Sequence, residues 1–567
     1  MDKMREILIA LVRIRMLHAI GAGVLLALAF PGVKLAGAAW VAPGLILLCA
    51  LGEKGWSVFR MGYVSGLAFW LTSLCWLLQI PVNKVFPFMG WVALSAYLAI
   101  YMGIWTWLCH RLLATLESNV LDNFASIGRL RRMAWAPLCA IIWVGLEAVR
   151  ARLLTGFPWN SLGVSQFEIL PLVQIASVTG VPGISFLVTW CSVALVSAGW
   201  LITKEPAARK LWTGELFLPA AVLAATWIWG ASELWHKIDQ KPRTTLKAAL
   251  IQPSIPQELI WDAQKDTNRF ARLLQQSESA AAAKPNLLVW PESAIPAMLR
   301  YDEFVLRAVT NFAVKHQIWM LVGSDDAIRK DDANAPDQIC FYNSAFLVSP
   351  DGRIVSQYSK QHLVIFGEYV PLERWIPFLK KLTPIGGSFT AGESSTPFEF
   401  EVLPENATAM SQTHQKIKAG VLICFEDVFA DLARKAAENG LDFLVNLTND
   451  GWFQESAAQW QHAANAAFRA VETGRPLVRC TNNGLTCWVD AAGRIMDVFY
   501  DEKSDIHGEG FMIISIPLTE PSHGPITFFG RHGDWFGLLC LFVTVCFAIH
   551  GSVRRLAPTI FKQAKLP

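Results

Sequence analysis

The segment KAGVLICFEDVF, residues 418–429, decides how the polar half of this chain folds. Its apolar run has the length and composition of a buried β-strand. Cys424 comes at the end of that run, and Glu426 and Asp427 follow before a stretch with helical periodicity. Backbone amides at a strand-to-helix turn favour a thiolate and can receive an oxyanion. The segment predicts an α/β domain with a cysteine nucleophile, although this pattern alone also fits a cysteine that only packs.

Two upstream segments carry ionisable side chains that complement a thiol. LLVWPESA, residues 287–294, brings Glu292 directly after a buried run, and YSKQHLVIFGEYVP, residues 358–371, contains Lys360 and Glu368. Each segment alone fits an ordinary turn with a surface charge. Together with Cys424 they supply the carboxylate, the ammonium and the thiol that covalent acyl chemistry uses.

These residue types have distinct expected roles. Glu292 is the candidate general base, which would accept the Cys424 proton and return it to the leaving group. Lys360 would stabilise the negative charge that develops on the attacked carbonyl oxygen. We expect Glu368 to orient the lysine or the entering amine, and Glu426 to support the site.

Short apolar runs alternate with amphipathic stretches between residues 246 and 520. Helical patterns are expected at Thr267–Ala283 and Phe429–Asn439, and SPDGRIV (349–355) and DAAGRIM (490–496) are typical of hairpin turns. The polar stretch 397–418 is expected to be a surface loop. The expected strands are LKAALIQ (246–252), NLLVW (286–290), IWMLVGS (318–324), NSAFLVS (343–349), AGVLICF (419–425) and DFLVNLT (442–448). This order predicts an α/β domain with αββα layers and strands buried on both faces.

The rest of the chain has the composition of a membrane protein. Hydrophobic residues make up 53% and charged residues 17% of the 567 residues, whereas soluble proteins carry about 25% charged residues. A membrane span needs about 20 mostly apolar residues. The candidate spans are 16–33, 35–51, 60–80, 88–112, 133–149, 181–203, 215–236 and 534–551. We therefore expect a bundle of about eight transmembrane helices, with domains at 1–240 (bundle), 245–520 (catalytic), 533–552 (last span) and 553–567 (tail).

Basic residues alternate between the loops in a way that predicts an orientation. They cluster before the first span, between the second and third, fourth and fifth, and sixth and seventh spans, and after the last span. The positive-inside rule then places both termini in the cytoplasm. Because an odd number of spans precedes the polar domain, that domain is expected outside, in the periplasm of a bacterium.

The cysteines, the histidines and the net charge give no reason to expect a cofactor or a nucleic-acid partner. Cys480 and Cys487 are expected to be structural, either as thiols or as a disulfide in an oxidising compartment. His362 and His462 are isolated in the sequence, so we expect no metal site. A net charge of +3 gives no reason to expect nucleic acid as a partner.

The three segments around Glu292, Lys360 and Cys424 resemble, in this order, the nitrilase superfamily. The downstream segments VNLTNDGWF (445–453) and QHAANAAFRAVETGRPLVRCTNNG (461–484) resemble the continuation of the same fold. Joined to a multi-span bundle, the domain is similar to the apolipoprotein N-acyltransferase family over nearly the whole chain.

That resemblance implies a substrate class and further site residues. It implies an enzyme of the bacterial inner membrane that acts without a cofactor, with a phospholipid as acyl donor. The acceptor would be the N-terminal amine of a diacylglyceryl-cysteine lipoprotein, and the enzyme is expected to be a monomer. The resemblance also marks Trp261 and Phe425 as substrate-binding residues. Phe425 stands where the family most often has tyrosine, so this position offers an aromatic ring without a phenolic hydroxyl.

Two other functions stay open on the sequence alone. A membrane-anchored amidohydrolase would share the first half-reaction and let water resolve the thioester. A lipid-binding or transport protein would need charged or broken helices at mid-membrane, and the spans contain few charges. Many spans favour the transferase, since a single anchor suffices for a hydrolase.

Overall fold

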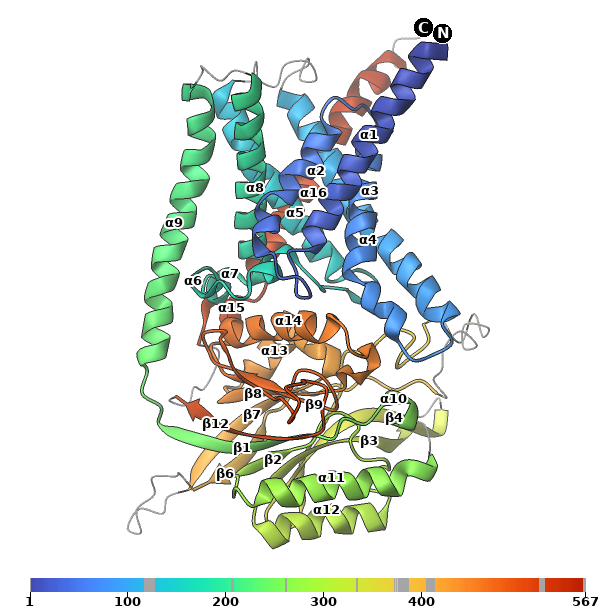
Figure 1. Ribbon diagram of the computed structural model, residues 1–567, viewed down its shortest axis with the longest axis vertical. Helices are drawn as coiled ribbons and strands as arrows, with labels where there is room; N and C mark the ends of the chain where they lie inside the picture. Colours follow the sequence, from blue (N-terminus) through green and yellow to red (C-terminus); the bar gives the residue numbers. More distant parts are fainter. Residues whose placement is uncertain are drawn as a thin grey trace. The chain divides into compact units, whose positions relative to one another are not determined.

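The computed structural model describes residues 2–116, 128–204, 209–260, 263–332, 335–371, 373, 375, 387–403, 414–519 and 526–563. The chain divides into two compact units. One consists of residues 1–75, 89–231 and 534–567, and the other of residues 76–88 and 232–533. Figure 1 labels the main helices and strands of each unit.

The first unit is built almost entirely of α-helices (Figure 1). Helix α5 packs against both α8 and α16, and α1 packs against α3. The long helices are α1 (Asp2–Ala27), α2 (Ala42–Ala50), α3 (Trp56–Ser73), α4 (Val85–Leu116), α5 (Arg129–Arg150), α8 (Val181–Lys204), α9 (Arg209–Asp239) and α16 (Trp535–Gln563). Shorter helical turns, η1 (Ala36–Trp40), η4 (Leu153–Thr155), η5 (Leu162–Gln166), α6 (Leu170–Val173) and α7 (Ala176–Thr179), connect them.

Some helices of this unit match the expected membrane spans in length and composition. Among the described residues, 4 helices are long and apolar enough to cross a membrane, at Val85–Leu113, Arg129–Arg150, Val181–Thr203 and Thr213–Asp239. Shorter apolar helices include Ile14–Ala27 and Trp535–Ile549, which overlap the first and last expected spans.

Two expected spans are divided in the structure. The expected span 35–51 is the turn η1 followed by α2, and the expected span 60–80 is α3 followed by the turn η2 (Cys75–Gln79). A total of about eight spans therefore stays a prediction.

Close backbone approach and paired charges hold the helices of this unit together. A side chain at Gly145 on α5 would meet Thr544 Oγ1 of α16 at 2.5 Å, so only glycine permits this contact. The buried Arg132 guanidinium lies 2.5 Å from Glu215, which offsets the cost of burying either charge.

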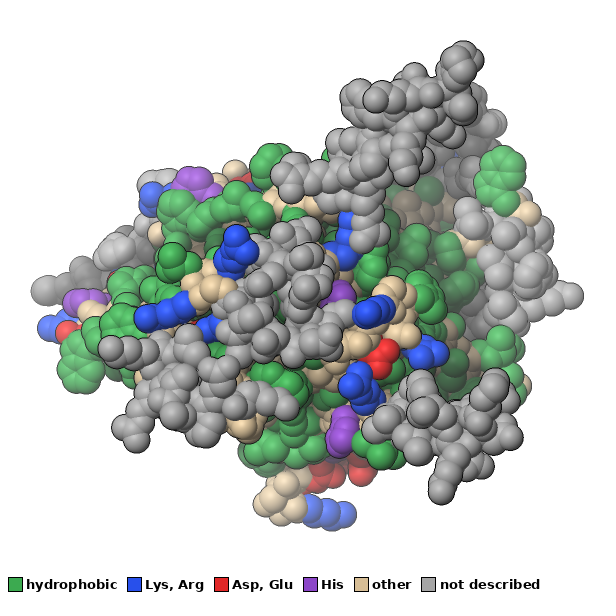
Figure 2. Space-filling view, turned by 90° about the horizontal axis from the view of Figure 1, so that it is seen from above, with side chains coloured by type: hydrophobic (Ala, Val, Ile, Leu, Met, Phe, Trp, Pro, Cys, Tyr) green, Lys and Arg blue, Asp and Glu red, His purple; other side chains and the backbone are tan. Residues whose placement is uncertain are grey.

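Some helix faces of this unit are apolar and exposed. Phe217 and Ile228 on α9 are 75% and 71% exposed. Figure 2 shows one face of the molecule, where Lys and Arg side chains lie among apolar ones.

The second unit contains two six-stranded sheets. One has the strand order β12-β1-β2-β3-β4-β5 and the other β11-β10-β9-β8-β7-β6. The strands are β1 (Thr244–Gln252), β2 (Leu287–Val289), β3 (Trp319–Asp332), β4 (Ala335–Val348), β5 (Ile354–Ser359), β6 (Phe398–Val402), β7 (Gln415–Ile423), β8 (Phe443–Thr448), β9 (Leu477–Thr481), β10 (Cys487–Val489), β11 (Ile495–Val498) and β12 (Gly510–Leu518). The expected strands all appear, and the hairpin predictions at 349–355 and 490–496 are confirmed by the antiparallel pairs β4·β5 and β10·β11.

Helices cover the outer face of each sheet, which gives the expected αββα layers (Figure 1). Helices α11 (Asp266–Ala281) and α12 (Glu303–His316) pack on the first sheet, and α13 (Ala430–Ala437) and α14 (Ala458–Thr473) on the second. A core of buried apolar side chains fills the space between the sheets. The short elements α10 (Gln257–Ile260), η6 (Ala263–Lys265), η8 (Cys424–Val428), η9 (Asp450–Phe453) and α15 (Phe528–His532) complete the unit.

The expected surface loop 397–418 is wrong at both of its ends. Residues Phe398–Val402 form β6, which pairs antiparallel with the start of β7 at Gln415–Ala419. Phe398 and Phe400 are buried while Glu399 and Glu401 point outward. This alternation is the pattern of an edge strand with one buried face. Residues 404–413 lie outside the described part of the chain.

The second unit also includes a segment from the first half of the chain. Trp76, which follows α3, donates its indole N–H to Gln461 Oε1 at 3.2 Å. Its ring also meets Phe453 edge-on, with 4.7 Å between the ring centroids. Residues 76–88 are therefore anchored on α14 and η9 of the second unit.

Candidate active site

Cys424 lies at the turn between β7 and the short helix η8. Strand β7 ends at Ile423, and Cys424 has φ +52°, a left-handed conformation that L-residues with a Cβ rarely adopt. Its carbonyl oxygen accepts a hydrogen bond of 3.0 Å from the Asn446 side chain on β8. The nucleophile candidate is thus held in a strained backbone conformation by side chains from a neighbouring strand.

Glu426, two residues further on, holds this turn from within. One of its carboxylate oxygens accepts from the Ile423 amide at 2.8 Å and from the Tyr358 hydroxyl at 2.8 Å. The other accepts from the amides of Gln361 and His362 at 2.6 and 3.0 Å. Burial raises the pKa of Glu426, and these hydrogen bonds oppose that shift. The carboxylate therefore links the cysteine turn to the segment that follows β5.

Lys360, the first residue after β5, places its ammonium between two carboxylates. Its Nζ atom lies 2.7 Å from Glu368 Oε1 and 3.2 Å from Glu292 Oε1. The Lys360 side chain is 1% exposed. Glu292 is the third residue after the end of β2. A buried ammonium is stabilised only if opposite charges accompany it, and here two do.

Asn343 on β4 fixes both carboxylates with one amide group. Its Nδ2 atom donates to Glu292 Oε1 at 2.8 Å and to Glu368 Oε1 at 3.2 Å. The second oxygen of Glu368 accepts from the Val364 amide at 2.8 Å. Both carboxylates are therefore held in one orientation relative to the Lys360 ammonium. Asn343 is not among the predicted site residues, because no sequence motif links it to the site.

The site keeps the cysteine protonated and the lysine charged. Burial alone would lower the pKa of Lys360, but the charges of Glu292 and Glu368 outweigh it and hold this pKa well above its usual value. Burial raises the pKa of the Cys424 thiol far above its usual range; the Glu292 charge adds to this, and the Lys360 charge opposes it. A base must accept the thiol proton before the sulfur can attack.

The structure brings most of the sequence-predicted residues together. Glu292, Lys360 and Glu368 are in direct contact, and the charges of Glu292 and Lys360 act on the Cys424 thiol. Trp261 lies outside the described residues.

Phe425 belongs to a small aromatic cluster beside the nucleophile. Its ring meets that of Phe429 edge-on at 5.2 Å, and the His362 ring lies 6.3 Å away. His362 also packs closely on Phe429, with 3.8 Å between the ring centroids. Burial lowers the pKa of His362 to about 4, and the nearby Lys360 charge adds to the shift. His362 is therefore neutral at physiological pH and acts as part of an apolar platform.

Four buried charged residues contact one another next to the turn that carries Cys424. We call them the buried charge cluster: Asp427, Asp450, His462 and Arg479. Their side chains are 0 to 1% exposed. His462 contacts both aspartates, at 2.7 Å and 2.8 Å, and Arg479 contacts both as well. His462 is isolated in the sequence, because its partners are distant along the chain and share no motif with it.

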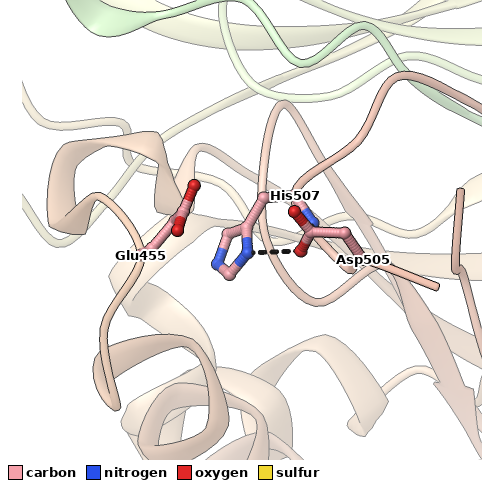
Figure 3. A group of neighbouring side chains, drawn as sticks. All are labelled: Glu455, Asp505 and His507. Carbon is pink, nitrogen blue, oxygen red and sulfur yellow. Dashed lines mark hydrogen bonds and ion pairs between the residues drawn. The ribbon is translucent and has the colours of Figure 1, made fainter. Parts of the chain in front are cut away.

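Three side chains that metals commonly use meet elsewhere in this unit (Figure 3). Ligand atoms of Glu455, Asp505 and His507 all lie within 4.8 Å of one another. The His507 ring already contacts Asp505 through Nδ1 at 2.8 Å, and the Asp505 side chain is 46% exposed. Because a histidine–carboxylate pair on a surface explains this arrangement, we assign no metal to it.

Cys480 and Cys487 are both free thiols. Cys480 on β9 lies between the sheets, where its sulfur contacts the carbonyl oxygens of Ile251 and Val289 at 3.3 Å. Cys487 on β10 is fully buried. Both therefore act as packing residues, and no disulfide joins them.

The arrangement of Glu292, Lys360 and Cys424 supports acyl transfer to sulfur. A carboxylate can accept the thiol proton, and an ammonium can stabilise the oxyanion of a tetrahedral intermediate. Such a site can act on amides, esters or thioesters, so its geometry alone does not select among acyl donors.

Known protein families match both the helical part and the α/β part of this chain. The carbon-nitrogen hydrolase family model matches residues 247–510, and the model of the apolipoprotein N-acyltransferase N-terminal domain matches residues 22–194. An apolipoprotein N-acyltransferase from Geobacter metallireducens is 34% identical over 541 residues, which cover 93% of this chain and 93% of that protein. One from Allorhizobium ampelinum is 29% identical over 91% of this chain and 93% of that protein. A crystal structure of a carbon-nitrogen hydrolase from Helicobacter pylori is 18% identical and covers 48% of this chain and 89% of its own, with a TM-score of 0.34.

Proposed function

Because this chain belongs to the apolipoprotein N-acyltransferase family, we propose that it acylates the N-terminal amine of diacylglyceryl-cysteine lipoproteins. A membrane phospholipid donates the acyl chain, and Cys424 carries it as a thioester between the two half-reactions. The observation that carries this mechanism is the position of the buried Lys360 ammonium, which lies between the Glu292 and Glu368 carboxylates.

In the first half-reaction the Cys424 sulfur attacks an ester carbonyl of the phospholipid. Glu292 accepts the thiol proton, and the oxyanion of the tetrahedral intermediate faces the Lys360 ammonium. The bond between carbonyl carbon and glycerol oxygen then breaks, and Glu292 returns the proton to that oxygen. The products are the acylated Cys424 and a lysophospholipid.

In the second half-reaction the α-amine of the lipoprotein attacks the thioester. Glu292 accepts the amine proton, a carbon–nitrogen bond forms, and the carbon–sulfur bond breaks. The thiolate takes the proton back from Glu292, which restores the resting site. Since both half-reactions need only these side chains, the mechanism requires no cofactor.

The supporting residues have roles that follow from their contacts. Glu368 fixes the Lys360 ammonium, and Glu426 fixes the turn that carries Cys424. Phe425, with Phe429 and His362, offers an apolar platform that suits an acyl chain. We propose that Trp261 contacts the substrate, a role that the family resemblance alone supports.

The first unit supports a donor from the bilayer. The described helices include several that are long and apolar enough to span a membrane, and apolar side chains such as Phe217 and Ile228 face outward. A protein with such faces is stable in hydrocarbon and not in water. An enzyme embedded in this way encounters phospholipid esters directly, and we propose that it works as a monomer.

We further propose about eight spans with the catalytic unit in the periplasm and both termini in the cytoplasm. The alternation of basic loops in the sequence supports this orientation. Arg15 illustrates the pattern: this cation near the first span is 45% exposed and pairs with Glu53 in the loop after α2. The expected location is the cytoplasmic membrane of a bacterium.

The proposal is tested by intact mass spectrometry of the purified full-length protein after incubation with a phospholipid of defined acyl chains. We expect an added mass equal to one acyl chain, removed by hydroxylamine and absent in Cys424→Ala. Cys480→Ala is the matched control, because Cys480 is also a buried thiol of the same unit and should leave the adduct unchanged.

A synthetic diacylated lipopeptide should then discharge the adduct and gain the acyl chain as an amide. Loss of the adduct to free fatty acid, with no peptide product, would identify an amidohydrolase-like enzyme instead. A folded wild-type protein that forms no adduct would contradict the phospholipid donor.

A further inference from the structure

The buried charge cluster contains two cations and two carboxylates in contact, directly behind the nucleophile turn. Asp427 belongs to η8, the same short helix that begins at Cys424. Asp450 begins η9, His462 lies on α14 and Arg479 lies on β9. Four separate elements thus converge on a group of charges that water does not reach. Such a group is costly to bury unless every member is paired.

The contacts of His462 fix its protonation state. Its Nε2 atom lies 2.7 Å from Asp427 Oδ1, and its Nδ1 atom lies 2.8 Å from Asp450 Oδ1. Both contacts are ion-pair distances. A deprotonated ring nitrogen would turn its lone pair toward a carboxylate oxygen at that distance and repel it, so each ring nitrogen must carry a proton. Arg479 Nη2 also lies 3.2 Å from Nδ1, but the carboxylate oxygen is closer. His462 is therefore an imidazolium.

With that charge the cluster is neutral, since His462 and Arg479 balance Asp427 and Asp450. The raised pKa of His462, about 9, agrees with this state: burial lowers this pKa, and the charges of Asp427 and Asp450 outweigh the effect of burial. A neutral imidazole would leave one carboxylate oxygen against a ring lone pair. The proton on His462 is therefore what keeps both aspartates in place.

Asp427 connects the cluster to the nucleophile through one amide. The Asn446 side chain donates from Nδ2 both to an Asp427 carboxylate oxygen and to the Cys424 carbonyl oxygen, the latter at 3.0 Å. Cys424 has φ +52°, a conformation that persists only when its surroundings enforce it. Asn446 is one of the groups that enforce it, and Asp427 orients Asn446.

We propose that His462 is a positioning residue of the acyl transfer, which holds the Cys424 turn in its reactive conformation through Asp427 and Asn446. This role rests on the proposed function, because Cys424 must be the nucleophile. His462 touches no substrate atom in this scheme. Its effect reaches the reaction only by keeping the thiol aimed at Glu292 and the acyl carbon.

The test compares His462→Gln with His507→Gln in the full-length protein in detergent. His507 is the matched control, because it also pairs with an aspartate, Asp505 at 2.8 Å, in the same unit. Two rates are measured: acyl adduct formation from phospholipid, and alkylation of Cys424 by iodoacetamide, followed by peptide mass spectrometry. We expect His462→Gln to slow both about 100-fold, the cost of a small misplacement of a reacting group, and His507→Gln to change neither.

A double-variant cycle separates positioning from general damage. If His462 acts through Asn446, the protein with both His462→Gln and Asn446→Leu should react no more slowly than Asn446→Leu alone. Multiplied effects of the two substitutions would overturn the proposal. Wild-type rates in a folded His462→Gln protein would overturn it as well.

Two measurements keep the proposal testable if His462→Gln does not fold. In the first, NMR spectra of the wild-type protein labelled with ¹⁵N-histidine are recorded at about pH 8, where exposed histidines are neutral. One histidine ring should then have both nitrogens protonated. Absence of such a ring would overturn the proposal. Asn446→Leu should slow Cys424 alkylation. Because alkylation needs no lipid, slowed alkylation without any acyl adduct in the wild type would contradict the phospholipid donor and leave the role of His462 supported.

Discussion

The Lys360 ammonium lies closer to Glu368 than to Glu292, at 2.7 Å against 3.2 Å. The two carboxylates therefore differ in how firmly they hold the lysine. Glu368 also accepts from the Val364 amide, and it serves as the anchor of the ammonium. Glu292, with the longer contact, is the carboxylate that we propose takes the proton from Cys424.

Replacement of Lys360 by methionine should abolish most of the acylation. The variant keeps the length of the side chain but removes the charge that faces the oxyanion. By analogy with the loss of one oxyanion donor, we expect thioester formation to fall about 10²- to 10³-fold. Lys418→Met is the control, since Lys418 pairs with Glu399 on a surface strand and should act at the wild-type rate. A Lys360→Met enzyme with full activity would exclude this role.

Replacement of Glu426 by glutamine should destabilise the protein. The side chain accepts from three backbone amides and one hydroxyl, and an amide group can serve as acceptor on one side only. We expect a loss of about 1–3 kcal/mol, measured as a lower thermal unfolding midpoint of the detergent-solubilised protein. Glu438→Gln is the control, because Glu438, directly after α13, is half-exposed and pairs with the surface residue Arg434. An unchanged midpoint would mean that Glu426 does not hold the turn.

The stability of the wild-type protein should fall between pH 6.5 and pH 9. The pKa of His462 is raised from 6.5 to about 9 in the folded protein, so folding binds its proton more tightly than the unfolded chain does. That contribution is complete below pH 6.5 and is lost as the pH rises through about 9. Its size is about 3 kcal/mol, and it is measured as the pH dependence of the unfolding midpoint relative to His462→Gln. Parallel curves for the two proteins would contradict the imidazolium.

Phe425 tests whether the site needs a phenolic hydroxyl. Phe425→Ala removes a ring that contacts Phe429 and part of the proposed apolar platform for the acyl chain. A loss of about 1 kcal/mol of transition-state binding would slow acylation about five-fold. Phe425→Tyr keeps the ring and should stay within about two-fold of the wild type. A large gain with tyrosine would show that the hydroxyl contributes to the chemistry, and that phenylalanine is a loss at this position.

Much of the catalytic fold could be predicted because its central strands are short apolar runs. The runs at 246–252, 419–425 and 442–448 are buried from both sides, which leaves no other interpretation of their composition. Strand β6 escaped prediction, because Glu399 and Glu401 made an edge strand resemble a polar loop. Its alternation of Phe398, Glu399, Phe400 and Glu401 was the available signal.

Some residues of the site could likewise be predicted from the sequence, and others could not. Glu292, Lys360 and Cys424 each end or follow a strand, so their approach in space follows from the topology of the sheets. Asn343 and His462 could not be predicted, since their importance lies in partners far away along the chain: Asn343 meets Glu292 across 51 residues. Such contacts carry no local pattern, and only the packed structure reveals them.

The segment that begins at Trp76 has a consequence for how this protein can be divided. It lies between two helices of the first unit in the sequence, yet its indole packs on Gln461 and Phe453 of the catalytic unit. A gene fragment encoding only residues 232–533 would leave the surface under that indole bare. The catalytic half is therefore not a detachable module, and a water-soluble version of the enzyme would need a new side chain to fill the place of a tryptophan encoded far upstream.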